Sequence, residues 1–115
     1  MIAGKVWGTT EALLRTPFVS VDRLKIVPHA QCSLHCHEHK WNAFIVLSGK
    51  LSIAVHKRDY ELVDVTHLGP GEMTVVRPGE YHRFQSGAEA VDALELYYPQ
   101  ELGEDIVRKD VGGRL

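Results

Sequence analysis

Histidines dominate one short segment of the chain. His35, His37 and His39 stand at alternate positions between Ser33 and Asn42. If this segment is a β-strand, the three imidazoles project from one face, because side chains alternate along a strand with a period of two. Neutral imidazole is the commonest metal ligand in proteins, so we interpret the segment as part of a metal site.

A second segment carries another candidate ligand. His82 follows a turn made by Pro78 and Gly79. Two hairpin edges that meet around one metal ion would bring His82 to His35 and His37. Nitrogen-rich ligation with open coordination positions suits iron, manganese, nickel, cobalt or zinc. We therefore expect a divalent transition metal as the cofactor and leave its identity open.

The two cysteines, Cys32 and Cys36, lie four positions apart and do not form a disulfide framework. On a strand, Cys36 would point away from the histidines on either side of it. We interpret both cysteines as small buried hydrophobes.

Composition restricts the class of protein. The 115 residues suffice for one domain, and 44% hydrophobic and 24% charged residues are ordinary for a globular chain. The net charge is −2 and the basic residues are scattered, which argues against a nucleic-acid partner. No apolar run approaches membrane-spanning length and the first residues do not resemble a cleavable signal. We therefore expect a cytoplasmic protein with a small-molecule ligand and no membrane partner.

Short alternating apolar stretches separated by turns predict an all-β protein, either a sandwich or a small barrel. Residues 33–47 are expected to form a strand pair or one long bent strand, residues 1–16 a short strand or a helical turn, and residues 101–110 a short helix. The other expected strands are 18–27, 50–55, 62–66, 73–76, 81–85 and 90–98. We expect one domain over residues 1–115, with a core at about 18–98 and a C-terminal tail at 99–115.

Both faces of one expected strand are apolar. Ala43, Ile45 and Leu47 alternate with Phe44 and Val46. One face fills the interior, and the other needs a second sheet or a second subunit to cover it. A homodimer is therefore expected.

The two histidine segments resemble the motifs of the cupin superfamily, whose fold is a double-stranded β-helix, a jelly-roll-like barrel. The first motif falls on His35, His37, Asn42 and Gly49. The second motif falls on Gly71, Pro78, Gly79 and His82. The resemblance implies that His35, His37 and His82 hold the metal, with Asn42 as fourth ligand in place of the glutamate that the family normally has.

The resemblance also directs attention to the residues around this ligand set. Because asparagine brings no negative charge to the metal, the site should attract an anionic ligand, with help from Arg77 or Arg83 if either points inward. His39 is an additional ligand, a base behind the ligands or a residue on the rim. The aromatic residues that flank the ligands are candidates to line a pocket, with the protein core as the alternative; they are Trp41, Phe44, Tyr81 and Phe84. The polar candidates for the barrel mouth, where a carboxylate would act as general base, are Asp92, Glu95 and Tyr97.

A narrower likeness covers most of the chain. Trp7 and Gly8, the stretch that ends at Gly49, and the tail 102–114 are similar to the C-terminal cupin of type II mannose-6-phosphate isomerases. This resemblance implies aldose-ketose isomerisation of a phosphorylated sugar, in which a metal polarises oxygens while a base moves the proton. Two other functions stay open, an iron-dependent dioxygenase and a ligand-binding or sensing module without catalysis, because one barrel supports many chemistries.

Overall fold

The computed structural model describes residues 2–100, 103 and 105–115. These residues form nine strands and no helix. The strands are β1 (Ile2–Lys5), β2 (Gly8–Arg15), β3 (Ser20–Ile26), β4 (Trp41–Ser48), β5 (Leu51–His56), β6 (Val63–Leu68), β7 (Met73–Val76), β8 (Tyr81–Ser86) and β9 (Val91–Tyr98). The all-β prediction is confirmed.

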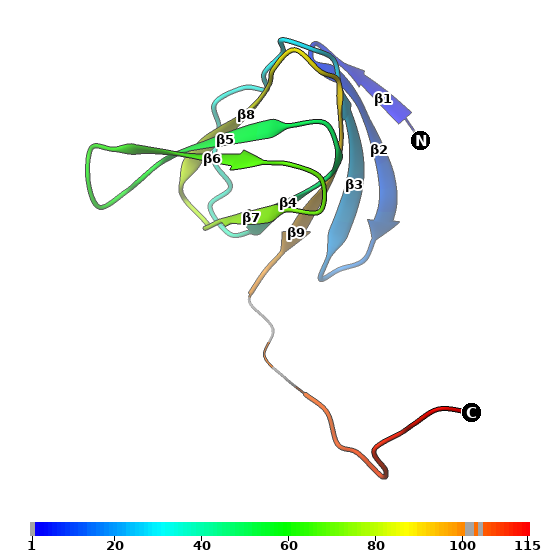
Figure 1. Cartoon of the computed structure of the whole chain (residues 1–115). Coiled ribbons are helices and arrows are strands. Elements are labelled where there is room, and N and C mark those ends of the chain that lie inside the picture. The colour runs from blue at the N-terminus through cyan, green and yellow to red at the C-terminus, as the bar shows by residue number, and fades with distance from the viewer. Residues whose placement is uncertain (1, 101–102, 104) are drawn as a thin grey trace.

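The strands make two antiparallel sheets that face each other (Figure 1). The larger sheet has the order β1-β2-β3-β9-β4-β7, and the smaller has the order β6-β5-β8. Neighbours in a sheet are often distant in the chain, since β3 pairs with β9 and β5 pairs with β8. This arrangement is the expected jelly-roll-like barrel.

The core lies between the two sheets and follows the period of two. In β5, Leu51, Ile53 and Val55 are buried, whereas Ser52 and Ala54 between them are half-buried on the outer face. The core cluster that they join draws on both sheets and on the loop before β4; its other members are Leu24, Ile26, Cys32, Phe44, Val46, Leu68, Val76, Phe84, Val91 and Ala93. Cys32 is buried, as predicted for a small hydrophobe, whereas Cys36 is only partly buried, so that prediction was wrong for Cys36.

The N-terminal residues differ from the prediction. In place of one strand or a helical turn, β1 and β2 form a hairpin that adds to the edge of the larger sheet through β3. Gly8 opens β2 with φ of 149°, and a Cβ there would lie 1.8 Å from the carbonyl oxygen of Lys25. Only glycine permits this close approach of β2 to β3.

The predicted strand across residues 33–47 was also partly wrong, because β4 begins only at Trp41. Residues 33–40 form a loop that meets β8 at a single bridge between His35 and His82. The backbone hydrogen bonds of this loop go to His82 of β8 and to Gly79 in the turn before it, and they form a single bridge and not a continuous ladder. The strict alternation expected for a strand therefore does not apply to this segment.

The C-terminal tail contains no helix among residues 103 and 105–115, and residues 101, 102 and 104 of the predicted helix lie outside the described residues. Figure 1 shows residues 105–115 lying away from the two sheets. Within the described part of the chain, no helix is long and apolar enough to cross a membrane.

Candidate metal and ligand site

Three of the predicted ligands come together. His35 and His37 lie on the 33–40 loop and His82 lies on β8, and one potential ligand atom from each lies within 4.8 Å of the others. Their ring centroids are 5.1 Å apart for His35 and His37, 4.7 Å for His35 and His82, and 5.6 Å for His37 and His82. The spacing brings three imidazoles within reach of one ion.

Backbone hydrogen bonds hold the two motifs against each other. The amide of His35 donates to the carbonyl of His82 at 3.1 Å, and the amide of His82 donates to the carbonyl of His35 at 2.8 Å. The amide of Gly79 donates to the carbonyl of His37 at 2.7 Å. Gly79 has φ of 80° and a Cβ there would lie 2.7 Å from the Arg58 guanidinium, so the turn before β8 favours glycine.

Asn42 and the buried His82 present hydrogen-bond acceptors to each other. The Asn42 amide nitrogen donates to the carbonyl of Leu96 at 3.1 Å, which directs its Oδ1 toward Nε2 of His82 at 3.0 Å. Nδ1 of His82 lies 3.0 Å from the carbonyl of Glu80, which accepts only, so Nδ1 carries the hydrogen of the neutral ring. Two acceptors therefore face each other, and a cation or a proton between them compensates the pair.

Electrostatics favour the metal-binding form of the histidines. Burial, reinforced by His35 and His82, lowers the pKa of His37 to about 4. Burial also lowers the pKa of His82, although the carbonyl of Glu80 opposes the shift. Nε2 of His37 is buried without a hydrogen-bond partner among the described residues. Neutral rings with uncommitted nitrogens, together with an amide oxygen, have the composition of a divalent transition-metal site.

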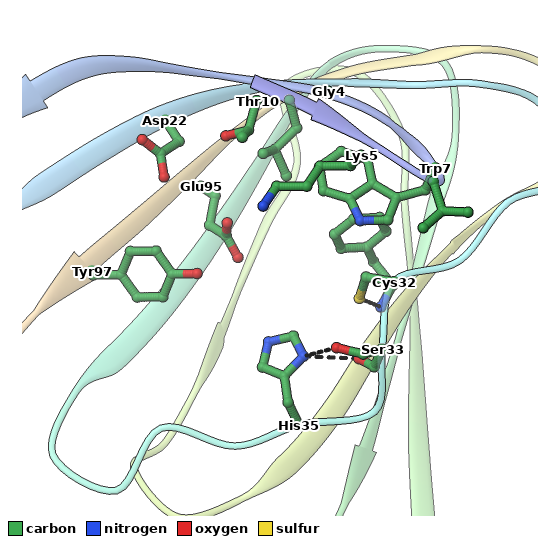
Figure 2. A pocket seen from close by; sticks show the side chains of 13 residues that line it. Gly4, Lys5, Trp7, Thr10, Asp22, Cys32, Ser33, His35, Glu95 and Tyr97 are labelled. Carbon is green, nitrogen blue, oxygen red and sulfur yellow. Dashed lines mark hydrogen bonds between the residues drawn. The ribbon is translucent and has the colours of Figure 1, made fainter. Parts of the chain in front are cut away.

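A pocket of about 610 Å³ opens beside this cluster, and Figure 2 shows its walls. The larger sheet contributes Asp22, Glu95 and Tyr97, whereas the loop before β4 contributes Ser33 and His35. Asp22 pairs with Glu95 across β3 and β9, so both carboxylates lie on the inner face of the sheet. The pocket is thus polar on two sides.

Glu95 is a buried carboxylate that lies beside Asn42. It is 8% exposed, its Oε2 lies 3.4 Å from the Asn42 amide nitrogen, and the Tyr97 hydroxyl donates to it. Burial raises the pKa of Glu95 to about 7, against the two hydrogen bonds that lower it. Burial and the neighbouring Glu95 raise the pKa of Tyr97, so its hydroxyl stays protonated. Asp22 contacts Arg15 at 2.6 Å, which compensates its charge.

Not every predicted site residue joins the cluster. His39 has a side chain that is 92% exposed and approaches only Glu38, at 3.8 Å, so it lies on the rim and not among the other histidines. Arg83 donates to the carbonyl of Cys32, and neither Arg83 nor Arg77 lines the pocket. Asp92 lies on the outer face of β9 and pairs with Arg23, whereas Glu95 and Tyr97 face the pocket as predicted.

The four candidate aromatic residues separate into different environments. Phe84 lines the pocket, and Phe44 is buried in the core with its ring centroid 6.2 Å from that of His82. Trp41 stacks on Tyr98 across neighbouring strands, and Tyr81 is an exposed residue of β8. Only Phe84 of the four therefore lines this pocket.

The N-terminal hairpin supplies pocket residues that sequence reasoning missed. Lys5, Trp7 and Thr10 line the pocket, and Figure 2 shows the Lys5 amine on the side of Glu95. The Trp7 ring meets the Phe84 ring edge to face, with centroids 4.9 Å apart. The β-propensity of Thr9 and Thr10 was the available signal, but it does not identify the sheet to which the strand belongs.

Two curated proteins are related to the chain over almost its whole length. Mannose-1-phosphate guanylyltransferase of Klebsiella pneumoniae is 27% identical over 111 residues, which cover 94% of this chain and 22% of that protein. The protein of the same name from Escherichia coli gives the same identity and coverage. The chain thus spans about a fifth of the length of these relatives.

Solved structures share the fold at low identity. KdgF from Halomonas sp. superposes with a TM-score of 0.74 at 16% identity, covering 88% of this chain and 89% of that chain. Oxalate decarboxylase of Bacillus subtilis gives 0.78 at 13% identity, covering 86% and 27%, and CapF of Staphylococcus aureus gives 0.77 at 16%, covering 90% and 29%. A family model described as a cupin domain matches residues 23–97. Spanning β4 to β9 and most of β3, that match shows that the chain belongs to the cupin family.

Proposed function

We propose that this chain is a metal-dependent cupin in which His35, His37, His82 and Asn42 hold a divalent transition metal. The observation that carries the proposal is the pair of acceptors formed by Nε2 of His82 and Oδ1 of Asn42, 3.0 Å apart in a buried setting. A bound metal accepts both lone pairs at once and supplies a Lewis acid for carbonyl and hydroxyl oxygens. The uncommitted Nε2 of buried His37 supports the same assignment.

The pocket is proposed to bind a small sugar-like molecule. Thr10 and Ser33 offer hydroxyls, and Asp22 and Glu95 offer carboxylates, which together suit a ligand with many hydroxyl groups. Lys5 and the metal balance the acidic charge. The two curated relatives, named for mannose 1-phosphate, support a phosphorylated sugar as the ligand class.

The proposed reaction is aldose-ketose isomerisation. Glu95, buried beside Asn42 and held by the Tyr97 hydroxyl, removes the proton from the hydroxyl-bearing carbon next to the sugar carbonyl and returns it to the carbonyl carbon. The proton of that hydroxyl passes to the former carbonyl oxygen, so the two carbons exchange carbonyl and hydroxyl. Asn42 orients the carboxylate through its amide nitrogen. The walls formed by Trp7 and Phe84 keep bulk water from the reacting carbons.

Isotope exchange tests this role of Glu95. Metal-loaded protein and mannose 6-phosphate are incubated in deuterated water, and incorporation at the carbon next to the carbonyl is followed by NMR. Glu95→Gln should slow exchange by roughly 10²–10⁴-fold, the usual contribution of a general base. Asp92→Asn is the matched control, because that carboxylate lies on the same strand but pairs with Arg23 away from the pocket.

Isotope exchange, together with oxygen uptake and ligand-induced stabilisation, separates the proposed isomerase from the other functions. Equal exchange in wild type and Glu95→Gln would rule out Glu95 as the base. Oxygen uptake with the iron-loaded protein and no exchange would indicate a dioxygenase. Stabilisation by the sugar phosphate without turnover would indicate a binding or sensing module.

We also propose that residues 1–115 act as one cupin domain that pairs with a second copy through the outer face of the larger sheet. Ala43 stands opposite Val75 and Leu96 on this face, and Ile45 stands opposite Met73 and Leu94. These apolar rows cross three strands, and Met73 and Val75 in them are exposed in the single chain. A cytoplasmic location stays a prediction.

A further inference from the structure

A second pocket, of about 550 Å³, continues the first one along the larger sheet. Asp22 and Tyr97 line both pockets. Asp22 stands opposite Glu95, and Ser20 stands opposite Tyr97, in consecutive rows on the inner face of β3 and β9. Rows on one face of a strand are separated by about 7 Å. The second pocket therefore lies one step beyond Glu95, in the direction of Pro99.

The 33–40 loop connects the two pockets through its histidines. His35 and His37 belong to the cluster of three histidines, and His35 also lines the first pocket. Further along the same loop, His39 and its neighbour Lys40 line the second pocket. His39 thus has a place in the site although it lies outside the metal cluster.

The two pockets differ in charge. The first has two carboxylates, Asp22 and Glu95, and one amine, from Lys5. The second has two permanent cations among its lining residues, Arg15 and Lys40, together with His39, and its one lining carboxylate is Asp22, which it shares with the first pocket. Even with Arg15 paired to Asp22, Lys40 gives these lining residues a net positive charge, which suits an anion.

Contacts within the protein hold these cations at the boundary between the pockets. Asp22 contacts Arg15 at 2.6 Å. The Lys40 amine lies 5.1 Å from the centroid of the Tyr97 ring, within the range of a cation–π contact. The other side of this boundary is the metal cluster, because the Tyr97 ring meets the His37 ring edge to face with centroids 5.0 Å apart.

We propose that the second pocket is an anion subsite that binds the terminal phosphate of the sugar, with Lys40 and Arg15 as its main contacts and His39 at its rim. The bound sugar would then extend along β9 from the three clustered histidines, past Tyr97, to the cations. This inference rests on the proposed function for the sugar end of the ligand, but recognition of the phosphate requires only the second pocket. The two are therefore separable by experiment.

The test uses metal-free protein, so that no anion is bound through a metal. Inorganic phosphate, mannose 6-phosphate and mannose are titrated, and the amide signals of the chain are followed by NMR. Phosphate and mannose 6-phosphate should shift the signals of residues 15–20 and 39–40. Mannose should leave those signals unchanged.

Lys40 is the residue to change, because it is exposed and its replacement does not disturb the core. Lys40→Ala should raise the Kd for phosphate and for mannose 6-phosphate about tenfold, the loss of one charge-assisted hydrogen bond. Lys40→Arg should stay within about twofold of wild type, because it retains the charge. Lys50→Ala, an exposed lysine that does not line either pocket, is the matched control.

Each outcome decides the proposal. Wild-type protein that binds neither phosphate nor mannose 6-phosphate would overturn it, as would an unchanged Kd in Lys40→Ala or an equal loss in Lys50→Ala. Metal content and isotope exchange are measured separately on loaded protein. Absence of metal or exchange together with the Lys40 effect would refute the proposed catalytic function and leave the anion subsite standing.

Discussion

Single side chains decide how this site handles charge. Asn42 occupies the position of a carboxylate in the cupin motif, and its Oδ1 donates a lone pair without a negative charge. In the proposed site, imidazole and amide ligands would leave a divalent ion with its full charge, and the buried Glu95 lies within hydrogen-bonding range of the Asn42 amide. The negative charge would then lie on the wall of the pocket and not in the ligand set.

Removing one imidazole should remove the metal. His37→Ala should lower the metal content of protein purified without an affinity tag, because residues behind the ligands do not replace a missing ligand. The metal affinity should fall roughly tenfold or more, since changing even a residue behind a ligand costs that much. Elemental analysis measures the metal, and circular dichroism verifies the fold. His56→Ala, in an exposed histidine of β5, is the control. Full metal content in His37→Ala and in the corresponding His35 and His82 variants would exclude this cluster as the metal site.

A carboxylate at position 42 should change the affinity for the metal and the affinity for the sugar phosphate in opposite directions. Asn42→Glu should tighten binding of a divalent metal, since the added charge neutralises part of the ion, and weaken binding of mannose 6-phosphate. Metal titration and calorimetry with the sugar phosphate measure the two effects. Asn42→Gln controls for the longer side chain. If both affinities remain at the wild-type values, Asn42 does not contact the metal.

Strands that bury one face were predictable, and the positions that depend on partners distant in the chain were not. β5 was evident because its alternation of apolar and small residues needs no knowledge of its neighbours. The 33–40 loop was taken for a strand because His35, His37 and His39 alternate, yet its backbone partners lie on β8 and in the turn at Gly79. That pairing gathers His35 and His37 and leaves His39 on the rim.

The ligand candidates themselves followed from residue type and spacing, whereas the pocket walls did not. Lys5, Trp7 and Thr10 reach the pocket only because β2 pairs with β3 in one register. The facing of Asp22 and Glu95 likewise depends on the pairing of β3 with β9. A single sequence does not show which strands distant in the chain pair with each other. These pocket residues could therefore be identified only from the fold.

The pairing of β3 with β9 gives a prediction about pH. The hydrogen bond from Arg23, together with its charge, lowers the pKa of the Asp92 carboxyl. A carboxyl with a lowered folded-state pKa stabilises the fold above its unfolded-state pKa of about 3.9, and this contribution is lost as the pH falls through the folded-state value.

Arg23→Gln should therefore lower the unfolding temperature near neutral pH by a small amount, because the pair is partly exposed. The difference in unfolding temperature from wild type should shrink as the pH falls below the pKa of an ordinary aspartate. Thermal unfolding across the pH range measures both effects, with Lys50→Gln as control. A difference that persists unchanged in acid would show that Arg23 acts through packing.

At the scale of the whole molecule, the two faces of the larger sheet differ in the side chains that they present. The inner face carries both pockets, and the outer face carries the apolar rows around Ala43 and Ile45. Since side chains alternate, a substitution on the outer face changes the proposed interface between copies without changing a residue of the inner face.

Met73→Arg tests the proposed homodimer. Met73 is 53% exposed on the outer face, and a charge there should convert a dimer to a monomer by placing an unpaired cation in the interface. Light scattering after size-exclusion chromatography measures the mass. Val65→Arg, in an equally exposed apolar residue of β6 in the smaller sheet, should leave the mass unchanged. A wild-type protein with the mass of one chain would refute the dimer.

The N-terminal hairpin is an edge element that also forms a wall of the pocket. β1 pairs only with β2, and its residues are exposed, so its backbone amides are expected to open more readily than those of the central strands. Lys5 and Trp7, at the end of β1 and in the following turn, nevertheless line the pocket. A ligand in the pocket should therefore suppress local unfolding at the edge of the sheet, and slowed hydrogen exchange in residues 2–10 would report on a ligand that lies against the opposite wall.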